Sequence, residues 1–78
     1  MKRKENRVVI SFHTTTEAIA MEEACREERI DGRLIPLPRV ISAGCGLAWS
    51  APSEKEQEIL KFMKKRGLTC ETTGIYLI

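Results

Sequence analysis

The strongest constraint on the fold is a short stretch, PLPRVISAGCGLA, near the middle of the chain. Pro36 and Pro38 lack the backbone N–H that a regular strand donates, so a strand has to stop there and the chain has to turn. A few residues later Cys45 stands between Gly44 and Gly46, neither of which has a side chain that could shield it. The stretch therefore predicts a turn that presents an accessible thiol. The alternative is a tight turn in which the cysteine is only a small apolar filler.

The length of the chain limits what can surround such a turn. Its 78 residues predict one domain, spanning 1–78, with a thin core, because a chain this short buries only about 60% of its unfolded surface. An elaborate enclosed active site has little room to form. The composition, 42% apolar and 31% charged, is typical of a water-soluble domain, and a net charge of +2 is too weak to indicate nucleic acid or an acidic membrane.

Neither a membrane span nor an export signal is visible in the sequence. No apolar run approaches the roughly 20 residues that cross a bilayer. The basic segment at 1–6 runs straight into a strand pattern, without the apolar region and cleavage site of a signal peptide. We therefore expect a cytoplasmic protein without a membrane partner.

The cysteine pattern bears on metals and redox chemistry. Cys25, Cys45 and Cys70 are an odd number of cysteines, no two of them form a Cys-x-x-Cys pair, and the single histidine, His13, is distant from each in sequence. These spacings argue against a structural zinc site and against a disulfide framework. We expect no metal and no cofactor.

The first part of the chain predicts a strand followed by a helix. The β-branched and aromatic run at 7–12 is typical of a buried strand. Thr14, with Glu17 three residues later, fits a capping box, which starts a helix. The Asp-Gly pair at 31–32 is the predicted helix end. Apolar side chains at helical spacing predict its buried stripe: Ala18, Met21, Ala24 and Cys25.

The rest of the chain predicts three strands, at 33–37, 46–50 and 74–78, with one helix between the last two. Ser53 and Glu56 offer a second capping box, and the helix is expected to run to about Arg66, where Gly67 ends it. Its core contacts are predicted to come from four apolar side chains: Ile59, Leu60, Phe62 and Met63. Glutamates early and basic residues late in this helix favour the helix dipole, which is sufficient to explain the basic cluster at its end.

The order strand, helix, strand, strand, helix, strand predicts the fold class. We expect an α+β, ferredoxin-like βαββαβ two-layer sandwich with an antiparallel sheet in the order 4-1-3-2. This order gathers several chain ends at one edge of the sheet. They are His13, Thr14, Pro38, Cys45 and the chain near Cys70.

In that arrangement Cys45 lies near the N-terminus of the first helix and near the only histidine. Both features lower the pKa of a thiol and enrich the nucleophilic thiolate. Arg39, on the preceding turn, adds a third favourable charge. Each neighbour also has a simpler interpretation, because His13 could only cap or pack at the sheet edge and Arg39 could be a solvated turn residue.

The other two cysteines and the tryptophan are interpreted as structural. In a regular ladder, Cys70 is roughly 10 Å from Cys45, beyond the roughly 7 Å limit for a disulfide, so we do not expect it to take part. Cys25 lies on the apolar stripe of the first helix and is predicted to be core. Trp49 is also predicted to be core.

The central stretch also resembles a known family. The segment LIPLPR at 34–39, followed by ISAGCGLA at 41–48, resembles the small bacterial selenium/sulfur carrier-like domain family, DUF3343. FHTT at 12–15 and the closing GIY at 74–76 are similar too, so the resemblance covers nearly the whole chain. It implies that Cys45 holds sulfur or selenium as a persulfide or selenosulfide. It also implies protein donors and acceptors as partners, in selenium metabolism or a sulfur relay.

The physical chemistry of the stretch is compatible with such a role. A carrier needs one accessible thiolate on a thin loop and no deep pocket. The backbone N–H groups beside Gly44 and Gly46 are unshielded and could hold a persulfide anion. The remaining supporting candidates are Ser42, Arg39, His13 and Thr14.

We therefore predict a stoichiometric carrier of sulfur or selenium on Cys45, rather than an enzyme with its own turnover. The alternative is a non-catalytic regulatory or protein-interaction module in which Cys45 is structural. Nucleic-acid binding is less favoured, because Phe12, Trp49 and Tyr76 are single aromatics rather than a stacking pair. A thiol peroxidase or reductase is less favoured because a resolving cysteine is missing. The oligomeric state is left open, although an edge-paired homodimer is compatible with the pattern.

Overall fold

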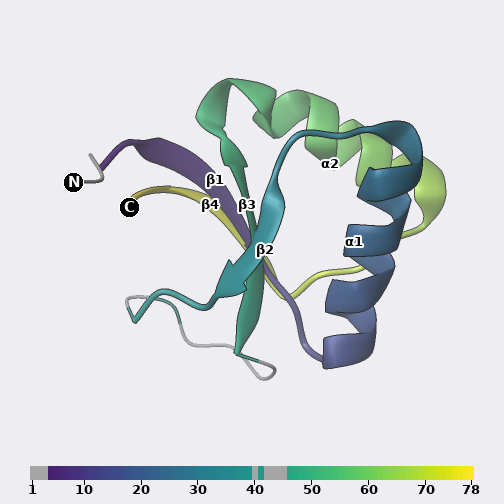
Figure 1. The fold of residues 1–78 in the computed structure, drawn as a ribbon, viewed down its shortest axis with the longest axis horizontal. Helices are drawn as coiled ribbons and strands as arrows, with labels where there is room; N and C mark the ends of the chain where they lie inside the picture. Colours follow the sequence, from purple (N-terminus) through teal and green to yellow (C-terminus); the bar gives the residue numbers. More distant parts are fainter. Residues whose placement is uncertain (1–3, 40, 42–45) are drawn as a thin grey trace.

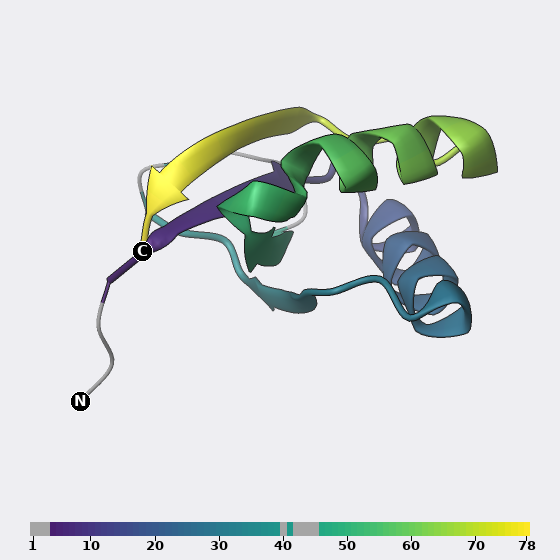
Figure 2. The same cartoon turned by 90° about the horizontal axis from the view of Figure 1, so that it is seen from above.

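The computed structural model describes residues 4–39, 41 and 46–78. Its elements follow the order β1 (Asn6–Ser11), α1 (Thr15–Glu28), β2 (Arg33–Pro36), β3 (Leu47–Pro52), a 3-10 turn η1 (Ser53–Lys55), α2 (Glu56–Arg66) and β4 (Thr72–Leu77). The sheet has the order β2-β3-β1-β4 with every neighbouring pair antiparallel. This α+β ferredoxin-like layout confirms the predicted fold class and strand order. Both helices lie on one side of the sheet (Figures 1 and 2).

The main core lies between the helices and the sheet. Alternate residues of the central strand β1 and the residue that follows it, Val8, Ile10 and Phe12, are fully buried on the helix-facing side. The predicted stripe of α1 is buried as expected, and α2 contributes buried Ile59, Phe62 and Met63. Leu60 is only half-buried, which differs from its predicted core position. Trp49 is buried, as predicted.

A second, smaller cluster covers the opposite face of the sheet. Val9 and Ala48 lie on this face, and Ile41 from the β2–β3 connection is buried against them. The Ile41 N–H donates to the Pro38 carbonyl at 3.0 Å, which closes a turn within the connection. Leu37 packs at the margin of the same cluster. The connection that carries the glycine-flanked cysteine is therefore anchored on the sheet by an apolar side chain.

The end of α1 differs from the prediction. The helix ends at Glu28, and Arg29 adopts the left-handed conformation with φ of 55°, in place of the predicted end at Asp31–Gly32. The Ile30 N–H donates to the Cys25 carbonyl at 2.9 Å, and Ile30 packs against the main core. The packing of partly buried Ile30 and the satisfied Cys25 carbonyl favour this helix end and oppose the cost of left-handed geometry at an arginine.

The start of α2 also differs from the prediction. Ser53 opens a 3-10 turn that ends at Lys55, and neither this turn nor α2 has a side-chain cap, so the second predicted capping box does not form. Glu56 is already the first residue of α2. The end of this helix is confirmed, because Gly67 has φ of 69° and the Leu68 N–H donates to the Met63 carbonyl at 2.9 Å.

The second strand begins at Arg33 as predicted, and the other strand boundaries differ from the predicted ranges by one or two residues. Among the residues that the structure describes, no helix has the length and apolar character needed to cross a membrane.

Candidate functional site at one end of the sheet

The predicted gathering of chain ends at one edge of the sheet is observed for the described residues. Ser11, at the end of β1, pairs with Ala48 near the start of β3 and with Thr72 at the start of β4. Pro36, at the end of β2, pairs with Leu47. Four strand ends and the N-terminus of α1 therefore meet here.

Backbone contacts define the approach to the glycine-flanked cysteine. The Leu37 N–H donates to the Gly46 carbonyl at 2.9 Å, so the β2–β3 pairing continues one step beyond the strands. Gly46 is exposed with φ of 74°, and a Cβ at this position would have no atom within 4 Å. Glycine is therefore favoured at position 46 by the left-handed backbone conformation, and not by a close approach of neighbouring atoms. Ser42, Gly44 and Cys45 lie outside the described residues.

His13 lies just beyond the paired part of β1. The pairing of β1 with β3 ends at Ser11 and Ala48, and the same register continued would bring His13 opposite Gly46. On the other side, the Glu71 N–H donates to the Ser11 carbonyl at 2.7 Å, so the β1–β4 pairing departs from its regular alternation there. His13 thus follows the last paired residue of β1 by two positions and directly precedes the Thr14 cap of α1.

Thr14 caps α1 as predicted. Its backbone is extended, and its Oγ accepts a hydrogen bond from the Glu17 N–H at 3.2 Å. The reciprocal bond of the capping box is shifted by one residue, because the Glu17 carboxylate accepts the backbone N–H of His13, at 2.7 Å, in place of that of Thr14. This shift ties the end of β1 directly to the first turn of the helix.

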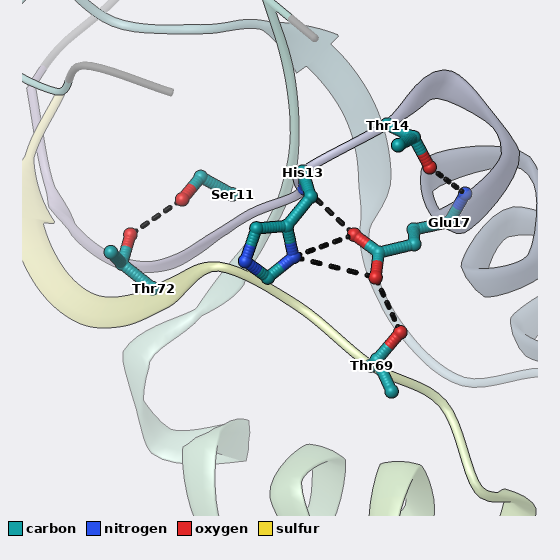
Figure 3. A network of polar contacts seen from close by, with 6 residues as sticks. All are labelled: Ser11, His13, Thr14, Glu17, Thr69 and Thr72. Atoms are coloured by element: carbon teal, nitrogen blue, oxygen red, sulfur yellow. Dashed lines mark hydrogen bonds and ion pairs between the residues drawn. The ribbon is translucent and has the colours of Figure 1, made fainter. Parts of the chain in front are cut away.

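Glu17 also holds the His13 ring (Figure 3). The Nδ1 atom of His13 is 3.1 Å from Oε1 of Glu17 and 3.4 Å from Oε2. The His13 side chain remains 55% exposed, whereas that of Glu17 is 21% exposed. The histidine is therefore fixed at one nitrogen and open to solvent elsewhere.

A third element completes the arrangement. Thr69, between α2 and β4, donates its hydroxyl to Oε2 of Glu17 at 2.5 Å (Figure 3). This hydrogen bond, followed by those from the backbone and ring of His13, lowers the pKa of the Glu17 carboxyl below its ordinary value. The sequence indicated Glu17 only as a capping residue and gave no signal for Thr69, which is distant in the chain.

Ser11 and Thr72 form the adjacent polar contact. Ser11 is fully buried, and its hydroxyl lies 2.5 Å from that of Thr72 across the β1–β4 ladder (Figure 3). The contact satisfies a buried hydroxyl and holds the two strands together just before His13.

The two described cysteines are disfavoured as nucleophiles. Cys25 is buried in the core, and burial raises the pKa of its thiol to about 11 despite an opposing effect of Arg66. Cys70 is half-buried, and burial, together with the nearby Glu17 charge, raises the pKa of its thiol. Both are therefore expected to stay protonated near neutral pH, where a thiol reacts slowly.

The remaining predicted neighbour, Arg39, is exposed on the connection after β2. Within the described part of the chain, no group of three or more His, Cys, Asp or Glu side chains is placed to hold a metal ion. The described site is thus a histidine, a carboxylate and two threonine hydroxyls, at the sheet end where the cysteine-bearing connection returns.

The fold and this site define a small ferredoxin-like α+β domain with a polar sheet end. The chain belongs to the family described as "Putative Se/S carrier protein-like", which matches residues 7–76. The match includes the FHTT segment and the whole PLPRVISAGCGLA stretch. No curated protein and no solved structure matches the chain.

Proposed function

We propose that this protein carries sulfur or selenium on Cys45, as a persulfide or selenosulfide, between protein partners. The observation that carries the proposal is the family match over residues 7–76, combined with a cysteine between two glycines within it. In this proposal the protein is a stoichiometric carrier that acts in the cytoplasm. The donor is a protein persulfide, and the acceptor is a second protein thiol.

The transfer step follows from thiol chemistry. The Cys45 thiolate attacks the outer sulfur of a donor persulfide, and a new S–S bond forms between Cys45 and that sulfur. The bond between the outer sulfur and the donor cysteine breaks, and its electron pair leaves on the donor sulfur. That thiolate takes up the proton that Cys45 lost, so one sulfur atom moves without net oxidation. An outer selenium atom transfers in the same way.

The neighbouring groups support an anionic Cys45. The N-terminus of α1 begins at the sheet end, and its partial positive charge favours a thiolate. Arg39 is a cation on the same connection, and the β1–β3 register, if continued by two residues, would bring His13 opposite the residue after Cys45. Backbone N–H groups at Gly44 and Gly46, the Ser42 hydroxyl and the Thr14 cap complete the proposed set of supporting groups.

The properties of the other cysteines favour loading at one position. Cys25 and Cys70 have raised thiol pKa values, so each presents little thiolate near neutral pH. A persulfide on Cys45 would then meet no competing thiolate within the same chain.

Intact-mass measurement tests the proposal. The protein is incubated with a cysteine desulfurase and cysteine, or with a selenium donor, and compared with Cys45→Ser and Cys70→Ser. We expect a gain of one sulfur or selenium atom in the wild type and in Cys70→Ser, and none in Cys45→Ser. An unloaded wild type, or a gain that persists in Cys45→Ser, would overturn the proposal.

One observation favours the alternative, a protein-interaction module. Glu5 and Ile78 exchange both backbone hydrogen bonds, so by alternation the backbone groups of Thr73, Ile75 and Leu77 point to the outer edge of β4. Ile75 and Leu77 are also 43% and 61% exposed. This edge could accept a strand from a partner, including a second copy of the chain.

The two functions differ in their need for the thiol. An interaction module keeps its partner, or its homodimer, when Cys45 is replaced by serine, whereas a carrier loses its cargo. Sedimentation analysis of wild type and Leu77→Lys determines whether the β4 edge pairs with a second copy. A shift from dimer to monomer in Leu77→Lys supports edge pairing, and a wild-type monomer excludes the homodimer.

A further inference from the structure

We propose that Glu17 and Thr69 are positioning residues that hold the His13 ring with Nδ1 protonated and Nε2 free to accept a proton. The arrangement consists of three side chains from three separate segments: the end of β1, the first turn of α1 and the α2–β4 connection. The role of His13 in moving the Cys45 proton rests on the proposed function. The hydrogen-bonded geometry of the His13 ring is independent of that function.

The tautomer follows from the identity of the partner. An ionised carboxylate can only accept hydrogen bonds, so the His13 nitrogen within 3.1 Å of Glu17 Oε1 has to be the donor. A neutral imidazole carries one proton, which leaves Nε2 as the acceptor. Figure 3 shows the second ring nitrogen on the side of the ring away from Glu17.

The carboxylate is itself fixed from two directions. The backbone N–H of His13 donates to Oε1 at 2.7 Å, and the Thr69 hydroxyl donates to Oε2 at 2.5 Å. Each oxygen is thus oriented by a group other than the ring. These hydrogen bonds hold the pKa of the Glu17 carboxyl below its ordinary value, so the group is an ionised acceptor for Nδ1–H at neutral pH.

The ionisable groups around the His13–Glu17 pair come from three segments of the chain. His13 follows β1, Glu17 lies on α1, and Cys70 lies on the α2–β4 connection, where burial and then the Glu17 charge raise its thiol pKa. Protonated Cys70 carries no charge that would compete with Glu17 for the imidazole.

In the proposed transfer, Nε2 of His13 first accepts the proton of the Cys45 thiol, and the thiolate so formed attacks the outer sulfur of the donor persulfide and displaces the donor thiolate. The same nitrogen then returns that proton to the departing donor thiolate, so the histidine ends in its starting state. Glu17 stabilises the transient imidazolium by accepting Nδ1–H throughout.

Nitrogen-15 NMR of the His13 ring tests the geometry independently of any cargo. At a pH where the ring is neutral, we expect the wild type to populate the Nδ1–H tautomer. Glu17→Ala should shift the ring severalfold toward Nε2–H, whereas Glu23→Ala, which removes another exposed glutamate from the same helix, should leave it unchanged. The same tautomer ratio in wild type and Glu17→Ala would overturn the inference.

The rate of Cys45 alkylation by iodoacetamide near neutral pH, located by peptide mass, tests the role. We expect His13→Asn to slow alkylation on the order of tenfold to a hundredfold, within the usual range of a general base, and Glu17→Ala to slow it similarly. If Glu17 acts through His13, the double variant is no slower than His13→Asn alone. Additive losses would show that Glu17 acts separately and would overturn its positioning role.

Two conservative substitutions at Thr69 test whether its hydroxyl matters. Thr69→Val removes the hydroxyl that orients Glu17 and should slow Cys45 alkylation, whereas Thr69→Ser keeps a hydroxyl and should restore the rate. Equal rates in these two variants would contradict a positioning role for Thr69. If Cys45 takes up no sulfur or selenium in the mass experiment, the proposed function fails, and the tautomer measurement still decides whether Glu17 sets the ring.

Discussion

At the residue scale, Glu17 is the side chain that organises the described site. One carboxylate accepts the backbone N–H and ring Nδ1 of His13 and the hydroxyl of Thr69, and so joins three segments of the chain. An isolated surface carboxylate contributes little to stability, because water competes for its hydrogen bonds. The main effect of the Glu17 carboxylate is therefore to orient the exposed ring of His13.

The lowered pKa of Glu17 makes stability depend on acid. Because the folded-state pKa lies below the unfolded one, the contribution of the carboxylate is complete above the unfolded pKa and is lost as pH falls through the folded pKa. We expect the free energy of unfolding of Glu17→Gln to lie below that of the wild type near neutral pH and to converge with it in acid. Urea denaturation across acidic pH measures this. Parallel curves for the two proteins would contradict the prediction.

Gly32 is a second residue whose identity is fixed by its surroundings. It has φ of 127°, and a Cβ there would lie 2.4 Å from Nε1 of the buried Trp49. We expect Gly32→Ala to lower the free energy of unfolding by about 2–4 kcal/mol, through backbone strain and overpacking. Gly67→Ala is the matched control, because Gly67 has φ of 69° but open space around it, and should cost only about 1 kcal/mol. Equal losses in urea denaturation would show that contact with Trp49 is unimportant.

At the element scale, the two helices begin in different ways. α1 starts at a side-chain cap, because Thr14 accepts the Glu17 N–H, whereas α2 follows a 3-10 turn and has no side-chain cap. The start of α1 is therefore encoded in a few adjacent residues. The start of α2 follows the 3-10 turn that connects it to β3.

This difference gives a paired prediction. Thr14→Ala should lower the free energy of unfolding by about 1 kcal/mol, the usual effect of losing an N-cap. Ser53→Ala, at the equivalent place in the predicted but absent capping box, should change it by less than about 0.5 kcal/mol. Thermal or urea unfolding of both variants measures the difference. A larger loss in Ser53→Ala would indicate that its hydroxyl caps α2 in solution.

The same contrast explains what the sequence could predict. The element order, the strand order, the start of α1 and its buried stripe follow from local patterns, and each is confirmed. The end of α1 at Arg29 could not be predicted, because it involves the packing of partly buried Ile30 against residues distant in the chain. The bond from Thr69 to Glu17 joins residues far apart in the chain, and no local pattern encodes it. The predicted roles of Ser42, Gly44 and Cys45 stay predictions, because these residues lie outside the described part of the chain.

At the scale of the whole molecule, the two faces of the sheet are covered by apolar clusters of very different size. The two helices and the large core cover one face (Figure 2). The other face is covered in part by Ile41 of the β2–β3 connection, which packs with Val9 and Ala48. A chain this short has few apolar residues to spare, so a side chain used in this way contributes substantially to stability. The β2–β3 connection is thereby attached to the sheet at Ile41.

Replacing that anchor tests whether attachment of the connection matters. Ile41→Ala should lower the free energy of unfolding by about 2 kcal/mol, the lower end for a buried isoleucine, because this cluster is small. Leu60→Ala, which truncates a half-buried residue on α2, is the control and should cost less. Since the same connection carries Cys45, Ile41→Ala should also change the rate of Cys45 alkylation while leaving the His13 tautomer intact. An unchanged stability would mean that Ile41 does not pack on the sheet in solution. An unchanged alkylation rate would mean that the thiol is positioned by its own glycine turn rather than by this anchor.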